Sequence, residues 1–300
     1  MAKGAKQRKV QVDVDQVTFG VEIECTLPDA AIRQMGIEIG SYHRGKLLPA
    51  PFPEGWNAQH DGSLDWGYGY RALEIVSPVL RGIEGLAEVL RVFEILNEAG
   101  VVVNGSCGFH VHVGARSVLG ARFSDSALVV RWVRRMLHLM SVHEMALFAL
   151  TGDAARANNY FCQTIKDQWD GVLETTSPVA TIVEKTDDHD DRYHTLNLCN
   201  LFDAKGTVEF RLFAATTDGM QALGYIVMAL GIAHRAATVG TVMSFDGQVR
   251  TAVQVDCRGA LADLQKALAR FGWPTGAKER WGRAIRQVQA ECARRFGEQA

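Results

Sequence analysis

The chain contains 300 residues, of which 47% are hydrophobic and 22% are charged, and its formal net charge is −2. This composition is that of an ordinary globular protein, and the small net charge excludes the overall basic field typical of nucleic-acid-binding proteins. No run of about 18 apolar residues is present, so no membrane-spanning helix is expected. We therefore expect neither nucleic-acid nor membrane partners.

Six cysteines are scattered along the chain without a CxxC pair, which argues against a zinc ribbon or a disulfide framework. Buried free thiols and the lack of a signal peptide predict a cytoplasmic protein. The basic residues 1–15 are expected to form a flexible tail. Because no Pro- or Ser-rich linker follows, we expect one domain over residues 16–300. Its helical part at 241–300 would pack on the domain or contact a second copy of the chain in a homo-oligomer.

Alternating apolar and polar residues predict strands, and apolar residues at helical spacing predict helices. The predicted strands are residues 18–25, 71–77, 107–115, 195–201 and 207–215. The predicted helices are residues 83–99, 124–150, 218–238, 258–270 and 276–296. Strands interleaved with helices favour an α+β fold, with an antiparallel or mixed sheet that helices cover on one face.

Capping residues mark the ends of three predicted helices. Gly100 follows the first of them, Ser124 and Asp125 open the second, and Asp218 opens the third. Residues 49–70 are rich in Pro, Gly and aromatic residues and predict a long surface loop, a kind of segment that is uncommon unless functional. Residues 184–191 form an acidic loop, for which a solvated turn and a segment over a site both remain open.

Polar side chains recur on one face of the predicted strands. Alternation places Glu22 beside Glu24 on the first strand, opposite Phe19, Val21 and Ile23. The other strands place these residues on their polar faces: Glu74, His110, His112, Glu209 and Arg211. On the last strand, Val208, Phe210 and Leu212 are predicted to form the apolar face. Each pair alone is typical of a solvated surface, whereas all of them together indicate a site.

This set of side chains suits a divalent cation and a phosphate. Mg²⁺ prefers carboxylate oxygens, and glutamates two residues apart on a strand lie close enough to share one ion or two. Such an ion also relieves the repulsion between Glu22 and Glu24. The guanidinium of Arg211 matches a phosphate oxygen. The chain has no GxxxxGK[ST] motif, so a P-loop enzyme is not expected.

Four motifs resemble the amidoligase family, a branch of the carboxylate–amine ligase superfamily that includes glutamine synthetase and glutamate–cysteine ligase. They are, in order, FGVEIE, DGSLDWGYGYRALEIVSP, NGSCGFHVHVG and RYHTLNLCNLFDAKGTVEFRLFAAT. Together they span residues 19 to about 217, roughly two-thirds of the chain. The resemblance implies a mostly antiparallel, glutamine-synthetase-like sheet, with helices on one face and a nucleotide and metal site on the other.

The resemblance also implies roles for individual residues. The metal ligands it implies are Glu22, Glu24, Glu74, Glu209 and His110. The residues it implies for nucleotide or phosphate binding are Arg211, His110, His112, Asn197 and Arg192, the last two matching less firmly. The implied catalytic residues are Glu24, Arg211 and His110. Asp61 and Ser63 match a turn of the family without an assigned role. The implied cofactors are ATP and Mg²⁺, with Mn²⁺ as a substitute.

The implied reaction joins a small-molecule or peptide acid to an amine. ATP phosphorylates a carboxylate, and an amine displaces phosphate from the acyl phosphate to give an amide or isopeptide bond. Two alternatives remain open at this point. The same ligands could serve a metal-dependent amide hydrolase, or the chain could be a non-catalytic, phage-related protein that binds nucleotide.

Overall fold

The computed structural model describes residues 17–150, 156, 159–165, 179–186 and 192–238. The expected basic tail at 1–15 lies outside these residues. So do the predicted helices at 258–270 and 276–296, the part at 241–300 and most of the acidic loop at 184–191. Within the described residues, no helix combines the length and the apolar character that crossing a membrane requires.

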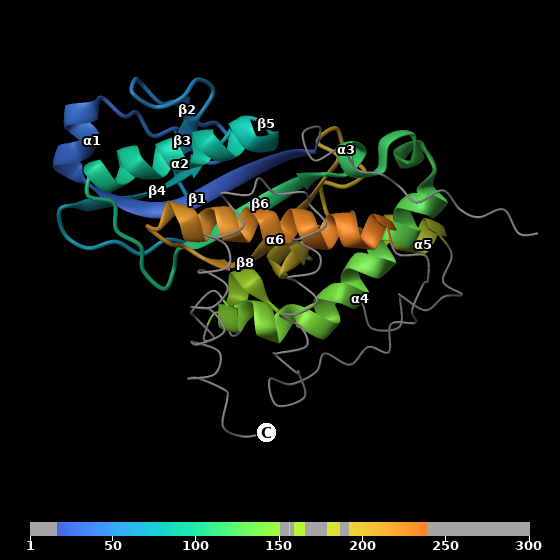
Figure 1. The fold of residues 1–300 in the computed structure, drawn as a ribbon. Helices are drawn as coiled ribbons and strands as arrows, with labels where there is room; N and C mark the ends of the chain where they lie inside the picture. The colour runs from blue at the N-terminus through green and yellow to red at the C-terminus, as the bar shows by residue number, and fades with distance from the viewer. Residues whose placement is uncertain (1–16, 151–155, 157–158, 166–178, 187–191, 239–300) are drawn as a thin grey trace, which may run out of the picture.

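An antiparallel sheet of eight strands forms the centre of the molecule (Figure 1). Its strands are β1 (Thr18–Pro28), β2 (Lys46–Leu47), β3 (Asn57–Gln59), β4 (Tyr70–Val76), β5 (Leu80–Arg81), β6 (Gly108–Gly114), β7 (Leu196–Asn197) and β8 (Thr207–Ala214). The spatial order is β2-β3-β4-β1-β6-β8-β7, and β5 pairs with β1 off this path. The predicted α+β class with a mostly antiparallel sheet is confirmed.

Six α-helices accompany the sheet in the described part of the chain. They are α1 (Asp29–Met35), α2 (Gly82–Glu98), α3 (Ala115–Leu119), α4 (Ser126–Leu150), α5 (Val179–Thr186) and α6 (Gly219–Thr238); short 3-10 turns cover Gly120–Ser124 and Tyr160–Cys162. The predicted caps are present: Asp125 Oδ1 accepts from Ala127 N at 2.9 Å, and Asp218 Oδ1 accepts from Met220 N at 2.8 Å. Gly100, which follows the C-terminal capping residue Ala99 of α2, has a φ of 78°, which favours glycine.

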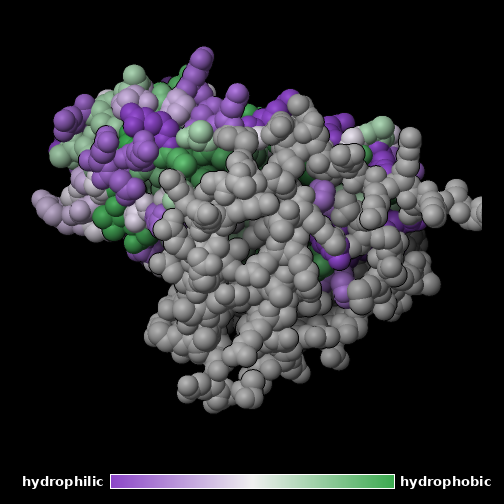
Figure 2. Space-filling view, in the orientation of Figure 1, coloured by the Kyte–Doolittle hydropathy of each residue, from purple (hydrophilic) through white to green (hydrophobic). Residues whose placement is uncertain are grey.

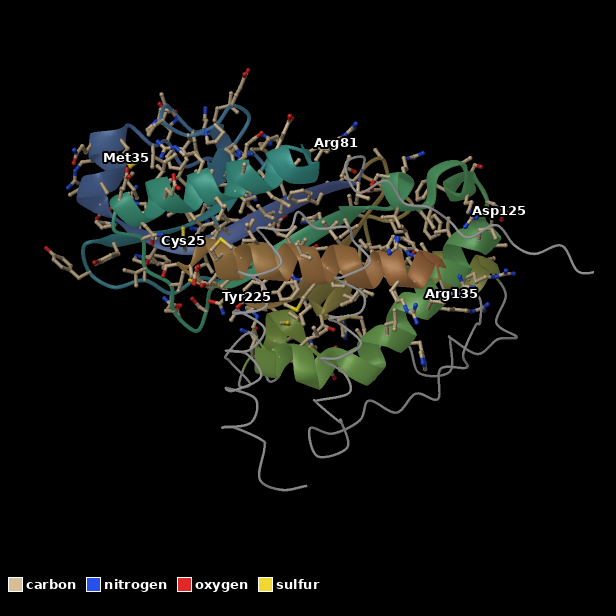
Figure 3. The ribbon with its side chains drawn as sticks, in the orientation of Figure 1. Cys25, Met35, Arg81, Asp125, Arg135 and Tyr225 are labelled. Carbon is tan, nitrogen blue, oxygen red and sulfur yellow. The ribbon has the colours of Figure 1, made fainter. Side chains whose placement is uncertain are left out.

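The helices α2 and α6 pack on the apolar face of the sheet (Figure 1). Four rings join the layers: Phe109 of β6 contacts Phe93 of α2 and Tyr225 of α6, and Tyr225 stacks on Phe213 of β8 with centroids 4.7 Å apart. Figure 3 shows Cys25 of β1 and Tyr225 in this same layer. The surface near α1 and α2, at the upper left of the view, is mostly hydrophilic (Figure 2). An amphipathic helix at the surface exposes such a polar face.

The segment at residues 49–70 is more than the surface loop that its composition predicts. It contributes β3, which pairs with β4 at the sheet. Trp56 and Ala58 are fully buried, and the indole of Trp56 donates to Glu88 of α2 at 3.3 Å. A strand of three residues is too short to show alternation, which explains why the sequence does not reveal it.

A bulge interrupts the pairing of β6 with β8. Phe109 faces Phe213 and Val111 faces Phe210, so Arg211 and Leu212 of β8 lie opposite the single residue His110 of β6. Two residues against one is the definition of a β-bulge, which bends a strand and redirects its side chains. Phe213 therefore also lies on the apolar side, where it stacks on Tyr225, and the predicted apolar residue Leu212 is fully buried in the core as well.

The ring layer predicts a large loss of stability on truncation of Phe109. Phe109→Ala removes a fully buried ring from the contact between β6, α2 and α6. We therefore expect the free energy of unfolding, measured in urea, to be about 3–5 kcal/mol lower than that of wild type. Leu47→Ala, at a side chain that is 73% exposed, serves as the control and is expected to change stability by less than about 0.5 kcal/mol. A Phe109 variant as stable as this control would show that the layer does not hold the sheet.

Candidate functional site

The strand register places the charged residues side by side across the polar face of the sheet. Glu74 of β4 is paired with Gln59 of β3 on one side and with Glu24 of β1 on the other. Glu22 of β1 is paired with His110 of β6. Further along, Glu209 of β8 is paired with His112 of β6 and with Asn197 of β7. Residues from six adjacent strands thus form one row, which we call the acidic row.

His110 lies at the centre of the acidic row with only 2% of its side chain exposed. Its Nδ1 is 3.1 Å from Glu22 Oε2 and 3.6 Å from Glu209 Oε1, and its Nε2 is 3.5 Å from Glu24 Oε1. One imidazole therefore contacts three carboxylates from two strands. This placement suits a residue that orients the carboxylates around it.

Glu22 is held between the two histidines of β6. His112 Nε2 lies 2.9 Å from Glu22 Oε1, while His110 binds the other oxygen. Burial alone would raise the pKa of Glu22, but the charges and hydrogen bonds of His112 and His110 hold that pKa well below its usual range. The pKa of His112 is raised, because the attraction of Glu22 and Glu209 outweighs its burial. Glu22 is therefore an anion in the folded protein.

Glu24 and Glu74 lie opposite each other with few compensating charges. Glu24 accepts a hydrogen bond from the backbone N–H of Gly108, and Glu74 accepts one from the side chain of Gln59. Burial, followed by the negative charge of Glu22, raises the pKa of Glu74 well above its usual value. Such a carboxyl group gains its charge most readily when a cation is bound beside it.

Asp61 joins this part of the acidic row from the loop after β3. One of its oxygens lies within 4.8 Å of ligand atoms of Glu24 and Glu74. Its Oδ1 accepts from Ser63 N at 2.7 Å and from Ser63 Oγ at 2.6 Å. The sequence assigned no role to this pair; here Ser63 orients Asp61 toward the glutamates.

Arg211 and Glu209 form a nearly buried ion pair at the other side of His110. Arg211 Nη1 is 2.5 Å from Glu209 Oε1, and the second oxygen of Glu209 accepts from Asn197 Nδ2 at 2.7 Å. Burial opposes the charge of each group, but Arg211 lowers the pKa of Glu209, and Glu209 with Glu22 and Glu24 raises that of Arg211. Both groups are charged, and 15% of the Arg211 side chain stays exposed.

The ligand atoms of the acidic row fit a hard divalent cation. Three groups of side chains bring their ligand atoms within 4.8 Å of one another: Glu22, Glu74 and His110; Glu22, His112 and Glu209; Glu24, Asp61 and Glu74. Carboxylates dominate each group and no cysteine contributes, which favours Mg²⁺ or Mn²⁺ over softer metals. The raised pKa of Glu74 supports the fit, because a cation offsets the like charges that surround it.

Arg192 lies away from the acidic row, at its rim. Its guanidinium covers the ring of Tyr193 at 4.6 Å and donates to the hydroxyl of that residue. Tyr42, half exposed, lies near enough to feel the charges of Arg192, Asp61 and Glu74, although burial is the larger cause of its raised pKa. Loops at residues 42 and 192 thus approach each other above the carboxylates.

Sequence reasoning did not identify three supporting residues. Gln59 lies in the short strand β3, Arg156 lies far from any motif, and Glu144 belongs to the predicted helix at 124–150. Glu144, fully buried in α4, accepts from the hydroxyl of Thr195 and from Ile165 N at 3.2 Å. Thr195 in turn accepts from Arg211 N at 2.9 Å. Only the tertiary structure connects these residues to the site.

The buried Glu144 predicts a pH-dependent stability. Burial, offset in part by the bonds from Thr195 and Ile165, raises its pKa to about 7. The folded state then binds a proton that the unfolded state releases near the ordinary glutamate pKa of about 4.3, so stability falls as pH rises from about 4.5 to above 7. The loss is at most about 4 kcal/mol, from about 1.4 kcal/mol for each pKa unit between about 4.3 and about 7.

We expect Glu144→Gln to keep the acceptor oxygen and to remove this dependence. Urea unfolding at pH 5, 6, 7 and 8, with Glu184→Gln as an exposed control, measures the slope. A variant whose stability falls with pH as steeply as that of wild type would contradict the assignment.

The position of Asp61 predicts its contribution to metal binding. Asp61→Asn replaces a charged ligand by a neutral one, so we expect the affinity for Mn²⁺, measured by electron paramagnetic resonance, to fall about tenfold or more. Asp65→Asn, in the same loop but exposed, should bind Mn²⁺ like wild type. Equal affinity in the two variants would remove Asp61 from the site.

Comparison with known proteins identifies a family and a related fold. The family model described as "Putative amidoligase enzyme" matches residues 15–233. Among solved structures, a bifunctional glutathione synthetase from Pasteurella multocida matches at 13% identity with a TM-score of 0.53, over 93% of this chain and 48% of its own. A novel glutamine synthase homolog matches at 16% identity with a TM-score of 0.42, over 94% of this chain and 68% of its own. No curated protein matches significantly.

The structural match supports the fold alone, and the chain spans about half the length of that glutathione synthetase. The family match carries more, because it covers the acidic row from β1 to β8 and continues into α6. It confirms the resemblance that the four motifs indicated, to a family described as a putative amidoligase enzyme. Since the family model spans well over half of its residues, this chain belongs to the amidoligase family.

Proposed function

We propose that this protein is an ATP-dependent carboxylate–amine ligase, which forms an amide or isopeptide bond through an acyl phosphate. The observation that carries the proposal is the ion pair of Arg211 with Glu209 at the edge of a cluster of carboxylates. A guanidinium beside metal-binding carboxylates is the combination that phosphoryl transfer requires, because the transferred group carries negative charge on several oxygens.

The proposed reaction consumes ATP as its only activating reagent. A carboxylate oxygen of the acid attacks the γ-phosphorus, the bond to ADP breaks, and an acyl phosphate forms. The nitrogen of the amine then attacks the acyl carbon, loses a proton, and inorganic phosphate leaves with the bonding electrons. No nucleophilic side chain is needed. Burial raises the pKa of the Cys107 thiol, which fits a cysteine without a role in this reaction.

Each group of residues has a distinct part in this proposal. Glu22, Glu24, Glu74, Asp61 and Glu209 are the carboxylates that would hold Mg²⁺ or Mn²⁺, and the ion would neutralise the phosphates of ATP and align them. Arg211 binds the oxygens of the transferred phosphoryl group. His110 orients Glu22, Glu24 and Glu209, and Asn197 fixes Glu209.

The substrates proposed are a small-molecule or peptide acid and an amine. Arg192 and the aromatic side chains at the rim would contact them, since loops above a rigid sheet commonly carry specificity. Arg192 lies beside Tyr193, and Tyr160 and Phe161 contact the same ring with centroids 5.4 and 5.3 Å away. These rings offer apolar surface next to a cation, which suits a substrate that combines both characters.

The two alternatives make different use of these residues. An amide hydrolase would use the same carboxylates to activate water, but it has no transferred phosphoryl group for Arg211 to neutralise. A non-catalytic protein would bind nucleotide without turnover. The nearly buried, fully charged Arg211 is therefore the residue that favours ligation.

Release of ADP tests the proposal. We expect ADP to form from ATP and Mg²⁺ only when pooled acids and pooled amines are both present. Arg211→Ala should lower the rate about 10²–10³-fold, because it removes a charge that stabilises the transition state. Arg91→Ala, an exposed arginine on α2, should leave the rate unchanged. Amide product formed without any nucleotide would favour the hydrolase instead.

Nucleotide binding separates the ligase from a non-catalytic protein. ATP with Mg²⁺ should raise the melting temperature of wild type and not that of Glu22→Gln, since that variant loses a metal ligand. A shift in wild type without ADP release for any acid and amine would favour a binding protein. Absence of any shift across nucleotides would contradict the proposed cofactor.

A further inference from the structure

Arg156 is a buried cation to which the proposed reaction assigns no role. Only 5% of it is exposed, yet its side chain lies on the polar face of the sheet. A side-chain carbon added to Gly108 would meet the guanidinium of Arg156, together with Nε2 of His110 and Oε2 of Glu24. The guanidinium thus occupies the space that a side chain at position 108 would fill, inside the acidic row.

The hydrogen bonds of Arg156 join the two strands that the bulge separates. Its Nη1 donates to the carbonyl of Cys107, directly before β6, and its Nη2 donates to the carbonyl of Arg211 in β8, both at 3.2 Å. Arg211 is one of the two bulged residues, and its backbone N–H donates outside β6, to Thr195. The sulfur of Cys162 also contacts the Arg211 carbonyl at 3.2 Å.

The segment that carries Arg156 also holds the side chain of Arg211. The carbonyl of Arg156 accepts from Asn159 N at 2.9 Å, and the side chain of Asn159 accepts from Phe161 N at 2.8 Å. The carbonyl of Phe161 accepts from Nε of Arg211 at 3.3 Å. One segment therefore binds Arg211 at its carbonyl and at its guanidinium.

We propose that Arg156 is a positioning residue, which fixes the bulge of β8 and thereby directs the guanidinium of Arg211 toward the metal-binding carboxylates. A bulge leaves backbone groups without their usual partners in the sheet and redirects the neighbouring side chains. Arg156 donates to the carbonyl of Arg211, together with the thiol of Cys162. Its planar fork reaches two carbonyls at once, which a lysine ammonium on a flexible stem does less well.

A buried guanidinium is costly unless charges and hydrogen bonds compensate it. Here two carbonyls and the nearby carboxylate of Glu24 offset the cost, while Nε of Arg156 has no hydrogen-bond partner among the described residues. A side chain that served stability alone would be replaced at little loss by an apolar one. Its location between Gly108 and Arg211 points to geometry as its contribution.

The first test follows Arg211 directly and does not depend on turnover. The Nε–H of Arg211, bonded to Phe161, should give a protected signal in ¹⁵N-edited NMR, assigned by its loss in Arg211→Lys. Arg156→Met should abolish its protection from exchange, and Arg91→Met should not. An Arg211 signal unchanged in folded Arg156→Met would overturn the proposal, whether or not the protein proves to be a ligase.

The second test rests on the proposed ligase function and uses a double-mutant cycle. Arg156→Met should lower ADP release about 100-fold, the loss typical of a misplaced catalytic group. If Arg156 acts through Arg211, the double variant with Arg211→Ala should be no slower than Arg211→Ala alone. Losses that multiply would show that Arg156 acts independently, and would overturn the proposal.

Two further variants test the role of Arg156 if Arg156→Met fails to fold. Arg156→Lys keeps the charge but not the fork, and should slow turnover about tenfold with partial loss of NMR protection. Gly108→Ala keeps Arg156 but fills its space, and should reproduce the exchange behaviour expected for Arg156→Met. If both variants keep the wild-type turnover and the wild-type exchange protection of the Arg211 Nε–H, then neither the planar guanidinium of Arg156 nor the space above Gly108 positions Arg211. That result would overturn the proposal.

Discussion

Repulsion between buried carboxylates is the constraint on which this structure depends. Glu22, Glu24, Glu74 and Glu209 come from three strands and share one face of the sheet within reach of a single imidazole or of one another. Like charges in a medium of low dielectric constant repel strongly, so they persist only if cations stand among them. His112 and Arg211 provide part of this compensation, and His110 adds a hydrogen bond to Glu22. Glu74, whose pKa is raised, marks where the compensation is incomplete and where a metal ion has most to contribute.

The opposite face of the sheet makes this crowding tolerable. The rings of Phe93, Phe109, Phe213 and Tyr225 lock α2 and α6 onto β6 and β8. Burial of large aromatic side chains contributes several kcal/mol each, enough to offset unfavourable electrostatics a few ångströms away. The same two strands thus carry aromatic packing on one face and His110, His112 and Glu209 of the acidic row on the other. Such division lets a rigid sheet hold acidic groups at fixed separations.

Much of the site follows from the sequence because strands have a period of two. Alternation alone places Glu22 with Glu24 and His110 with His112, and the register then aligns them as one row. What alternation does not reveal is pairing between distant segments. Gln59 lies in a strand too short to show a pattern, and Asp61 becomes a candidate ligand only through the turn that Ser63 stabilises. Glu144 and Arg156 act through contacts with Thr195 and Arg211, which no local pattern encodes. The bulge is also hidden, since Leu212 continues the apolar period of Val208 and Phe210, whereas Phe213, which faces Phe109, does not.

The bulge in β8 has a consequence for engineering the protein. Before the bulge, Glu209 is fixed by ordinary strand pairing with His112 and Asn197; within the bulge, Arg211 depends on a segment outside the sheet. Glu209, a proposed metal ligand, and Arg211, the proposed phosphate-binding cation, therefore differ in their backbone supports, although one residue separates them and their side chains form an ion pair. Libraries that vary residues 159–163 would alter the support of the Arg211 guanidinium while the strand pairing of Glu209 stays in place. A sheet without the bulge would couple the two, and any change to one would disturb the other.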